Sequence, residues 1–224
     1  MRNAIKIDKD LVVTIDNSGC IGEKEQDVVK VPNELAAYYS ARVSILEQWC
    51  AGAHPTHLFL ANFTNQEAWQ DYEKGFRKVF AELGEKMPPL NGSTESNFDS
   101  LQSGLSLTVI GKVVFEVNEE NCDWFIVGKP LVGEEVVNQP EDVAKLEELL
   151  LLIKMKVIKH VWPVGSKGIK AECKEIFKNN EIQCNLPLEK SGGPSTCVIV
   201  AVDREQLDQF QDSITAPIEK LKIC

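Results

Sequence analysis

The sequence predicts an α+β protein built from two lobes, and three observations lead to that prediction. In the first half, runs rich in apolar and β-branched residues alternate with two helical patterns, in the order β-β-α-β-α-β. A further set of strand and helix signals begins near Asp123, so we expect an N-terminal lobe over residues 1–118 and a C-terminal lobe over residues 119–224. A chain of 224 residues is long enough for two such lobes with a buried core.

The elements of the first lobe follow from periodicity and from capping residues. Asn33 is a candidate cap for the first helix, whose apolar residues recur every three or four positions and leave Arg42 and Glu47 off the apolar stripe. The capping box that begins at Thr64 opens the second helix, and Gly84 ends it. The expected strands and helices cover residues 11–15, 27–31, 33–51, 58–63, 64–83 and 105–117.

The second lobe shows the same mixture of strands and helices. Ser166 is a candidate cap for a helix that starts at Ile169, and Asp203 is a candidate cap for the last helix. The expected elements cover residues 122–127, 141–159, 161–164, 169–177, 182–188 and 196–202.

Five loops combine glycine with Ser, Thr, Asn or Lys. Backbone N–H groups, hydroxyl groups and a lysine can together hold phosphate without a Walker sequence, which this chain lacks. Five such loops in one chain favour a polyphosphate site, although each loop alone reads equally as a polar connector. They cover residues 17–22, 91–97, 128–133, 163–168 and 190–195.

Four carboxylates are candidate magnesium ligands, because Mg²⁺ prefers oxygen and usually bridges to substrate phosphates. Asp16 and Asp27 lie at strand ends, Glu47 lies on the polar edge of the first helix, and Glu95 lies in the loop over residues 91–97. The alternative is that they are turn, cap or solvated surface carboxylates.

Composition limits the classes of function. The net charge of −10 argues against a nucleic-acid or anionic-membrane partner. The longest apolar run, residues 149–153, is far too short to span a bilayer, and the first residues lack the apolar core of a signal peptide. Seven cysteines, an odd number without a C-x-x-C pair, favour reduced thiols in the cytoplasm over a zinc cluster or a disulfide framework.

Three segments resemble the aminoimidazole ribonucleotide synthetase (PurM-like) superfamily. Ala51-Gly52-Ala53-His54-Pro55 is similar to its G-A-x-P turn, and Gly92-Ser93-Thr94-Glu95 resembles its glycine-rich loop ending in T/S-E. Leu107-Thr108-Val109-Ile110-Gly111 looks like the V-T-V-x-G strand that follows. The resemblance implies a two-lobed PurM-like fold, an ATP-binding N-terminal lobe, and a homodimer whose barrel is built from both N-terminal lobes.

Within this superfamily the chain looks most like the short α-ribazole kinase branch. Residues 128–133, 163–169 and 191–196 support that likeness, together with the loop after Gly92. It implies an ATP- and Mg²⁺-dependent kinase that phosphorylates the nucleoside α-ribazole in cobalamin lower-ligand salvage, with the C-terminal lobe on the acceptor side. The residues expected to bind ATP are Asn62, Gly92, Ser93, Thr94, Ser166, Ser191 and Gly192, and the expected catalytic cations are Lys129 and Lys167.

The chain departs from the superfamily pattern at several acidic positions. Ile45-Leu46-Glu47 replaces the usual Asn-Asp pair of the first helix, and Ala61-Asn62 replaces an aspartate on the next strand. Two alternatives therefore stand beside the kinase. One is another ATP-dependent enzyme of the superfamily, similar to selenophosphate synthetase or to the cyclo-ligases, and the other is a non-catalytic nucleotide-binding homodimer.

Overall fold

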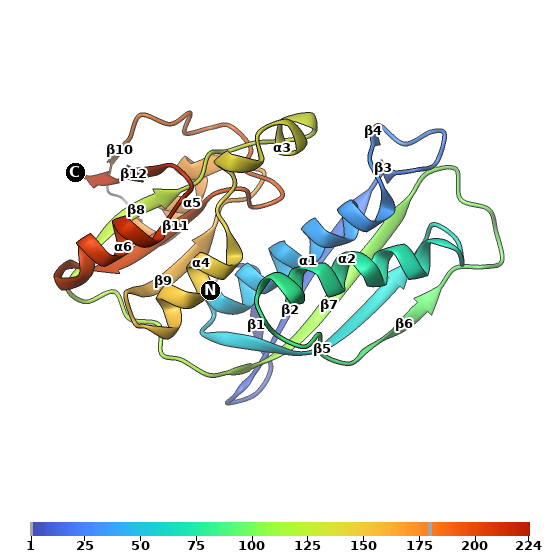
Figure 1. The fold of residues 1–224 in the computed structure, drawn as a ribbon, viewed down its shortest axis with the longest axis horizontal. Helices are drawn as coiled ribbons and strands as arrows, with labels where there is room; N and C mark the ends of the chain where they lie inside the picture. The colour runs from blue at the N-terminus through green and yellow to red at the C-terminus, as the bar shows by residue number, and fades with distance from the viewer. Residues whose placement is uncertain (1, 179–180) are drawn as a thin grey trace. The chain divides into compact units, whose positions relative to one another are not determined.

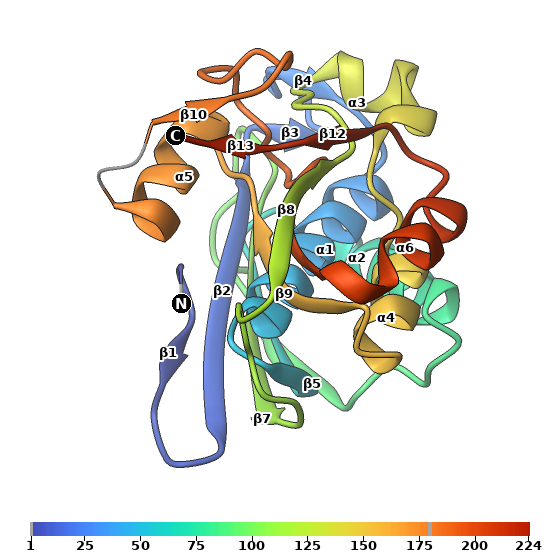
Figure 2. The ribbon, with the colours of Figure 1, turned by 90° about the vertical axis from the view of Figure 1, so that its left-hand side faces the viewer.

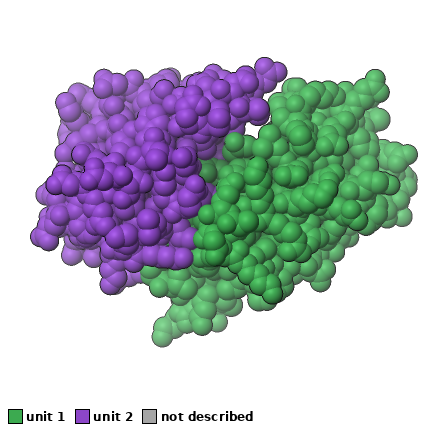
Figure 3. All heavy atoms as spheres, in the orientation of Figure 1, with its two compact units in different colours: residues 1–115 green, residues 116–224 purple. Residues whose placement is uncertain are grey.

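The structure is a computed structural model that describes residues 2–178 and 181–224. The chain divides into two compact units, one that ends at Phe115 and one that begins at Glu116 (Figure 3). We call them unit 1 and unit 2. Each has its own principal sheet.

Unit 1 is built on a five-stranded sheet in the order β1-β2-β7-β5-β6 (Figure 1). Its neighbouring strands are antiparallel, except that β6 pairs with β5 in parallel. Figure 2 shows the short β1 beside the long β2. The bounds are β1 (Ile5–Lys6), β2 (Leu11–Gly19), β5 (Ala53–Asn62), β6 (Leu90–Thr94) and β7 (Gly104–Val113), and a small parallel pair joins β3 (Ile21–Gly22) to β4 (Val29–Lys30).

Two helices form a second layer against this sheet. α1 (Asn33–Cys50) packs on β2, β5 and β7, and α2 (Ala68–Glu82) packs on α1. Strand β2 shows the alternation that this arrangement requires, because Val12 and Thr14 are buried whereas Leu11 and Ile15 are exposed. The helices therefore cover one face of the sheet.

The first helix is more deeply buried than its single apolar stripe predicts. Arg42 and Glu47, which lie off that stripe, are both inaccessible to solvent or nearly so. Gln48 is buried as well, and its Nε2 donates to Val109 O at 3.0 Å and to Thr14 Oγ1 at 3.1 Å. Polar side chains therefore bridge α1 to the sheet, an arrangement that helical periodicity does not reveal.

Several local predictions in unit 1 are wrong. The capping box at Thr64 does not open α2, because Glu67 takes the cap position and no side chain caps the helix. Asp16 is not at a strand end, because β2 continues to Gly19 into the predicted loop over residues 17–22.

Asn33 is the first helical residue and not the cap; Pro32 takes the cap position and no side chain caps the helix. Residues 90–94 form the edge strand β6, although their composition predicts a loop. A Cβ on Gly92 would lie 1.9 Å from Leu60 O, so glycine is what allows this close strand approach.

Unit 2 is built on a four-stranded antiparallel sheet in the order β12-β8-β11-β9. The inner strands β8 and β11 are almost entirely buried. The strands are β8 (Cys122–Val127), β9 (Ile158–Pro163), β11 (Val198–Asp203) and β12 (Ile218–Lys220), with a separate pair of β10 (Ile182–Gln183) and β13 (Lys222–Ile223). The helices are α3 (Glu134–Asn138), α4 (Leu146–Lys154), α5 (Gly168–Phe177) and α6 (Leu207–Ser213), with 3₁₀ turns η1 (Pro140–Asp142) and η2 (Arg204–Gln206).

The long helix predicted over residues 141–159 is wrong in its bounds. Val143 and Lys145 are extended, so η1 and α4 are separate. At this break the backbone pairs with the segment before β11, because Ala144 N donates to Thr196 O at 2.9 Å. Lys156 then takes a left-handed conformation with φ of 60°, and the chain enters β9.

Other predictions are confirmed. The α+β class holds for both units. Asp203 accepts a hydrogen bond from Glu205 N at 3.0 Å and so caps the 3₁₀ turn η2, but it does not cap the last helix as predicted, because Gln206 takes the cap position of α6. Across the described residues, no helix has both the length and the apolar character that crossing a membrane requires.

Candidate functional site

Two of the four predicted carboxylates lie together in unit 1. Asp16 lies on the helix-covered side of β2, and Glu47 lies on α1, which packs directly on β2. Glu47 is close enough to influence the ionisation of Asp16, and Ser40, also on α1, donates a hydrogen bond to Asp16. We call these two carboxylates the Asp16–Glu47 pair.

Glu47 is fully buried and is held by the segment before β1. It accepts hydrogen bonds from Asn3 N and Asn3 Nδ2, both at 3.2 Å, and forms an ion pair with Arg2. The Arg2 side chain is 16% exposed, so the ion pair is largely shielded from water. A buried carboxylate needs such compensation, and here the chain supplies the cation itself.

Asp16 is poised between its charged and neutral forms near pH 6. Burial raises the pKa of Asp16 from its ordinary value of 3.8 to about 6, and the charge of Glu47 acts in the same direction. The hydrogen bond from Ser40 and the charge of Arg2 lower the pKa but do not offset burial. A cation bound near Asp16 would favour the ionised form of its carboxyl group and so lower the pKa.

Asn62 and Thr94 meet at the ends of β5 and β6. Asn62 Nδ2 donates to Thr94 Oγ1 at 3.2 Å and to Asn65 O at 2.6 Å, while Asn62 Oδ1 accepts from Thr64 N at 2.9 Å. Asn62 is buried, whereas Thr94 is half-buried on the edge strand. The structure thus brings these two predicted nucleotide-binding residues into contact.

The rest of the predicted loop lies exposed along the same edge. Gly92, Ser93 and Glu95 are exposed, and Glu95 Oε1 accepts from Asn97 N at 2.7 Å. Strand register places Asp16 and Gly92 in one row across the sheet, with β7 and β5 between them. At about 4.8 Å per strand spacing, roughly 14 Å separates their backbones.

Asp27 lies apart from the other carboxylates and is engaged in the chain. Its oxygens accept from Ser103 N at 2.7 Å, Ser103 Oγ at 2.6 Å and Lys24 N at 2.8 Å. This buried side chain ties the turn before β4 to the segment before β7. Within residues 2–178 and 181–224, no group of three or more His, Cys, Asp or Glu side chains is arranged to hold a metal ion.

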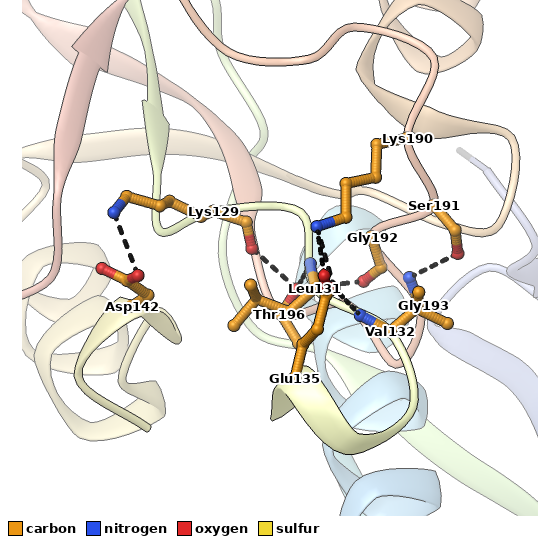
Figure 4. A network of polar contacts seen from close by, with 10 residues as sticks. All are labelled: Lys129, Leu131, Val132, Glu135, Asp142, Lys190, Ser191, Gly192, Gly193 and Thr196. Atoms are coloured by element: carbon orange, nitrogen blue, oxygen red, sulfur yellow. Dashed lines mark hydrogen bonds and ion pairs between the residues drawn. The ribbon is translucent and has the colours of Figure 1, made fainter. Parts of the chain in front are cut away.

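In unit 2, Lys129 is held at both its backbone and its side chain. Lys129 Nζ lies 3.0 Å from Asp142 Oδ2 (Figure 4), and Lys129 N donates to Asp142 O at 2.8 Å. The Lys129 side chain is 44% exposed, so its ammonium group is paired and still accessible.

The glycine loop over residues 190–195 lies beside Lys129. Figure 4 shows Lys190 reaching Glu135, with an ion pair of 2.8 Å, and Ser191 Oγ accepting from Gly193 N at 3.2 Å. Gly192 N donates to Gly165 O at 3.0 Å, which joins this loop to the one that precedes α5. Three of the five predicted loops therefore converge in unit 2.

Ser166 and Lys167 are exposed at the start of α5. The helix begins at Gly168, its cap position is Lys167, and no side chain caps it, so the predicted Ser166 cap is wrong. Both side chains are left available to solvent beside the loop that contains Gly192.

Several residues of these sites carry no signal in the sequence. Arg2, Asn3 and Ser40 contact the Asp16–Glu47 pair only because the fold brings them there. Thr196 is buried at the centre of the unit 2 loops, but its sequence context is that of a strand start. Only the glycine-rich composition around it marks the region.

No protein-family model matches the sequence, and no curated protein matches it either. Solved structures are similar in fold at low identity. E. coli HypE, a hydrogenase maturation protein, has a TM-score of 0.63 at 11% identity, over 94% of this chain and 79% of that chain. AaThiL complexed with AMPPCP and TMP has a TM-score of 0.64 at 11% identity, over 98% and 83%.

A third similar structure is that of T. maritima PurL complexed with AMPPCP. Its TM-score is 0.61 at 12% identity, over 97% of this chain and 42% of the longer PurL chain. The likeness to all three extends across nearly the whole of this chain, and so includes both units. The chain therefore has the PurM-like α+β fold.

Proposed function

We propose that this protein is an ATP- and Mg²⁺-dependent small-molecule kinase that phosphorylates α-ribazole in cobalamin lower-ligand salvage. The observation that carries the proposal is the likeness in fold, across almost the entire chain, to AaThiL complexed with AMPPCP and TMP and to PurL complexed with ATP. Unit 1 is then the ATP-binding lobe, and unit 2 is the acceptor lobe.

The Asp16–Glu47 pair supports a metal site in unit 1. Its donors are carboxylate oxygens, which are the ligands that a hard cation prefers. Glu95 and Asp27 are the further candidate ligands, although Asp27 already accepts three hydrogen bonds. Magnesium would neutralise phosphate charge, and Asp16 and Glu47 would hold it.

The edge of β5 and β6 supports the nucleotide side of the same lobe. Asn62, Thr94, Ser93 and the backbone of Gly92 offer amide, hydroxyl and N–H groups for phosphate or ribose oxygens. Because roughly 14 Å separates this edge from Asp16, the two groups would contact different parts of one extended ligand.

In unit 2, the proposed catalytic cations are Lys129 and Lys167, with Ser166, Ser191 and Gly192 as further phosphate contacts. Phosphoryl transfer needs mainly positioning and neutralisation of developing charge, which ammonium groups and backbone N–H groups can provide. Lys129 is accessible, and Ser166 and Lys167 are exposed.

The charge balance of unit 2 favours an uncharged acceptor. Lys129 is paired with Asp142 and Lys190 with Glu135, so each of these cations already has a carboxylate partner. An anionic acceptor would have to compete with those carboxylates, whereas the hydroxyl group of a nucleoside would not. This is the structural support for a nucleoside acceptor.

The uncovered face of the unit 1 sheet supports a homodimer. Ile15 and Phe59 flank Thr108 in one row across β2, β7 and β5, on the face opposite the helices. They are 57% and 40% exposed, and a second copy could bury them. All seven cysteines are free thiols, in keeping with a cytoplasmic location.

The kinase is tested by measuring ADP release from ATP in the presence of α-ribazole, other nucleosides or no acceptor, with and without Mg²⁺. The proposal predicts Mg²⁺-dependent release that α-ribazole stimulates most, and a phosphorylated product of matching mass. Activity confined to a different class of acceptor, such as selenide or an amide donor, would replace the kinase by another ATP-dependent enzyme of the superfamily.

One observation favours a second candidate, a non-catalytic nucleotide-binding homodimer. Arg2 and Asn3 already satisfy Glu47, so the chain itself supplies the cation that a metal ion would otherwise provide. Calorimetric titration that shows ATP binding without any hydrolysis or transfer would select this candidate over the kinase.

A further inference from the structure

Thr196 lies at the junction of the unit 2 loops and is completely buried. Its hydroxyl group donates to Lys129 O at 2.8 Å and accepts from Leu131 N at 3.0 Å (Figure 4). One side-chain oxygen therefore fixes the backbone on both sides of Pro130. A hydroxyl group can do this because it donates and accepts at once.

The backbone of Thr196 extends the junction to two further segments. Thr196 N donates to Gly192 O at 2.8 Å, and Ala144 N donates to Thr196 O at 2.9 Å. A single residue thus joins the Lys129 segment, the glycine loop and the break between η1 and α4.

These contacts determine where the Lys129 ammonium group can reach. Asp142 holds Lys129 from one side, through Lys129 N and Nζ. Thr196 holds it from the other side, through Lys129 O. With both peptide groups fixed, the backbone of Lys129 is held beside the glycine loop, and its accessible side chain points to Asp142 (Figure 4).

We propose that Thr196 is a positioning residue, which fixes the backbone of Lys129 beside the glycine loop and so sets where the Lys129 ammonium group meets the acceptor and the transferred phosphoryl group. The inference rests on the proposed function for its catalytic consequence. Its structural part, that the Thr196 hydroxyl fixes Lys129, stands without it. Thr196 acts through Lys129 and Gly192 and does not itself touch the substrate.

The test compares Thr196→Val, which keeps the shape and removes the hydroxyl, with Thr196→Ser, which keeps the hydroxyl. Thr215→Val is the matched control, because Thr215 Oγ1 donates to Glu148 Oε1 at 2.6 Å on the exposed surface of the same unit. Asp142→Asn loosens the other anchor of Lys129 and provides a second route to the same effect if Thr196→Val folds poorly.

Two quantities are measured for each variant. The first is steady-state kinetics with α-ribazole, together with the Kd for ATP. The second is the rate at which an amine-acylating reagent modifies Lys129, followed by peptide mass spectrometry, which needs no enzymatic activity.

For Thr196→Val we expect kcat/KM for the acceptor to fall about tenfold or more, since a buried donor and acceptor lose their partner. The Kd for ATP and the behaviour of Thr215→Val should stay at the wild-type value, and Thr196→Ser should recover most of the loss. Lys129 should be acylated at a changed rate in Thr196→Val and in Asp142→Asn, but not in Thr196→Ser.

Equal impairment in Thr196→Ser and Thr196→Val would overturn the inference, because the hydroxyl would then not matter. So would an unchanged rate of Lys129 acylation in Thr196→Val. If the wild-type protein transfers no phosphate to any acceptor, the kinase proposal fails, and the acylation result still decides whether Thr196 positions Lys129.

Discussion

Replacing Asp16 by asparagine should stabilise the protein at neutral pH while impairing the proposed Mg²⁺-dependent activity. The pKa of Asp16 rises from 3.8 to about 6 in the folded state, mainly because the side chain is buried. A shift of about two pKa units corresponds to about 3 kcal/mol. Asparagine cannot ionise and so avoids this cost, which already includes the attraction to Arg2; because its amide replaces the contacts of the carboxyl group only in part, we expect a net gain of about 1–3 kcal/mol.

The direction of the pKa shift determines how the free energy of unfolding changes with pH. Because the folded-state pKa lies above the unfolded value, the folded state binds more protons between about pH 4 and pH 6. The wild-type free energy of unfolding should therefore fall as the pH rises through that window. The advantage of Asp16→Asn should be fully present above about pH 6 and should vanish below about pH 4.

The assay is urea unfolding of both proteins at several pH values, with Asp99→Asn as the control at an exposed position of the same unit. A gain that is the same at pH 4 and pH 7.5 would refute the reasoning, because it could not come from ionisation. A destabilised Asp16→Asn at pH 7.5 would show that the contacts of Asp16 outweigh the cost of burying its charge.

Three other substitutions test separate parts of the structure. In urea unfolding, Gly92→Ala should destabilise unit 1 by about 1–3 kcal/mol, since a Cβ would lie 1.9 Å from Leu60 O. The control Gly19→Ala should change stability by less than about 0.5 kcal/mol, because nothing lies within 4 Å of its added Cβ. In the same assay, Glu47→Gln should lower the free energy of unfolding by about 1–3 kcal/mol, because it weakens buried contacts. Glu73→Gln, in an exposed ion pair, should lower it by less than about 1 kcal/mol. Equal effects would contradict the importance of burial. Thr94→Val should lower ATP-dependent turnover about tenfold with an unchanged melting temperature, and full activity would remove this residue from the proposed site.

Much of the fold could be predicted because local patterns decide it. The bounds of β8 agree with the predicted strand over residues 122–127, where the apolar run over residues 124–127 is buried on both faces. The first helix extends over nearly all of its predicted length, and its end near Gly52 follows from glycine. The resemblance to the PurM-like superfamily predicted the two-lobed α+β fold.

What could not be predicted depends on contacts between distant residues. Segment 141–159 has helical periodicity throughout, but pairing of Ala144 with Thr196 breaks the helix. Residues 90–94 have turn composition and still form a strand, because β5 offers a parallel edge. The ion pair between Arg2 and Glu47 spans 45 positions, and no local pattern encodes it.

The candidate site was predictable to a similar degree. Residue types led to Asp16 and Glu47, and the structure places them together, but their burial and the role of Arg2 follow only from packing. In the same way, loop composition led to Lys129 and Gly192 without revealing Thr196, the residue that joins them.

The most direct measurement of the central claim is a crystal structure of the protein with a non-hydrolysable ATP analogue and Mg²⁺. The account predicts a metal ion bound by Asp16 and Glu47, with Arg2 displaced from Glu47, and a nucleotide in contact with Thr94 at the edge of unit 1. A nucleotide bound away from both groups, or no nucleotide at saturating concentration, would contradict it.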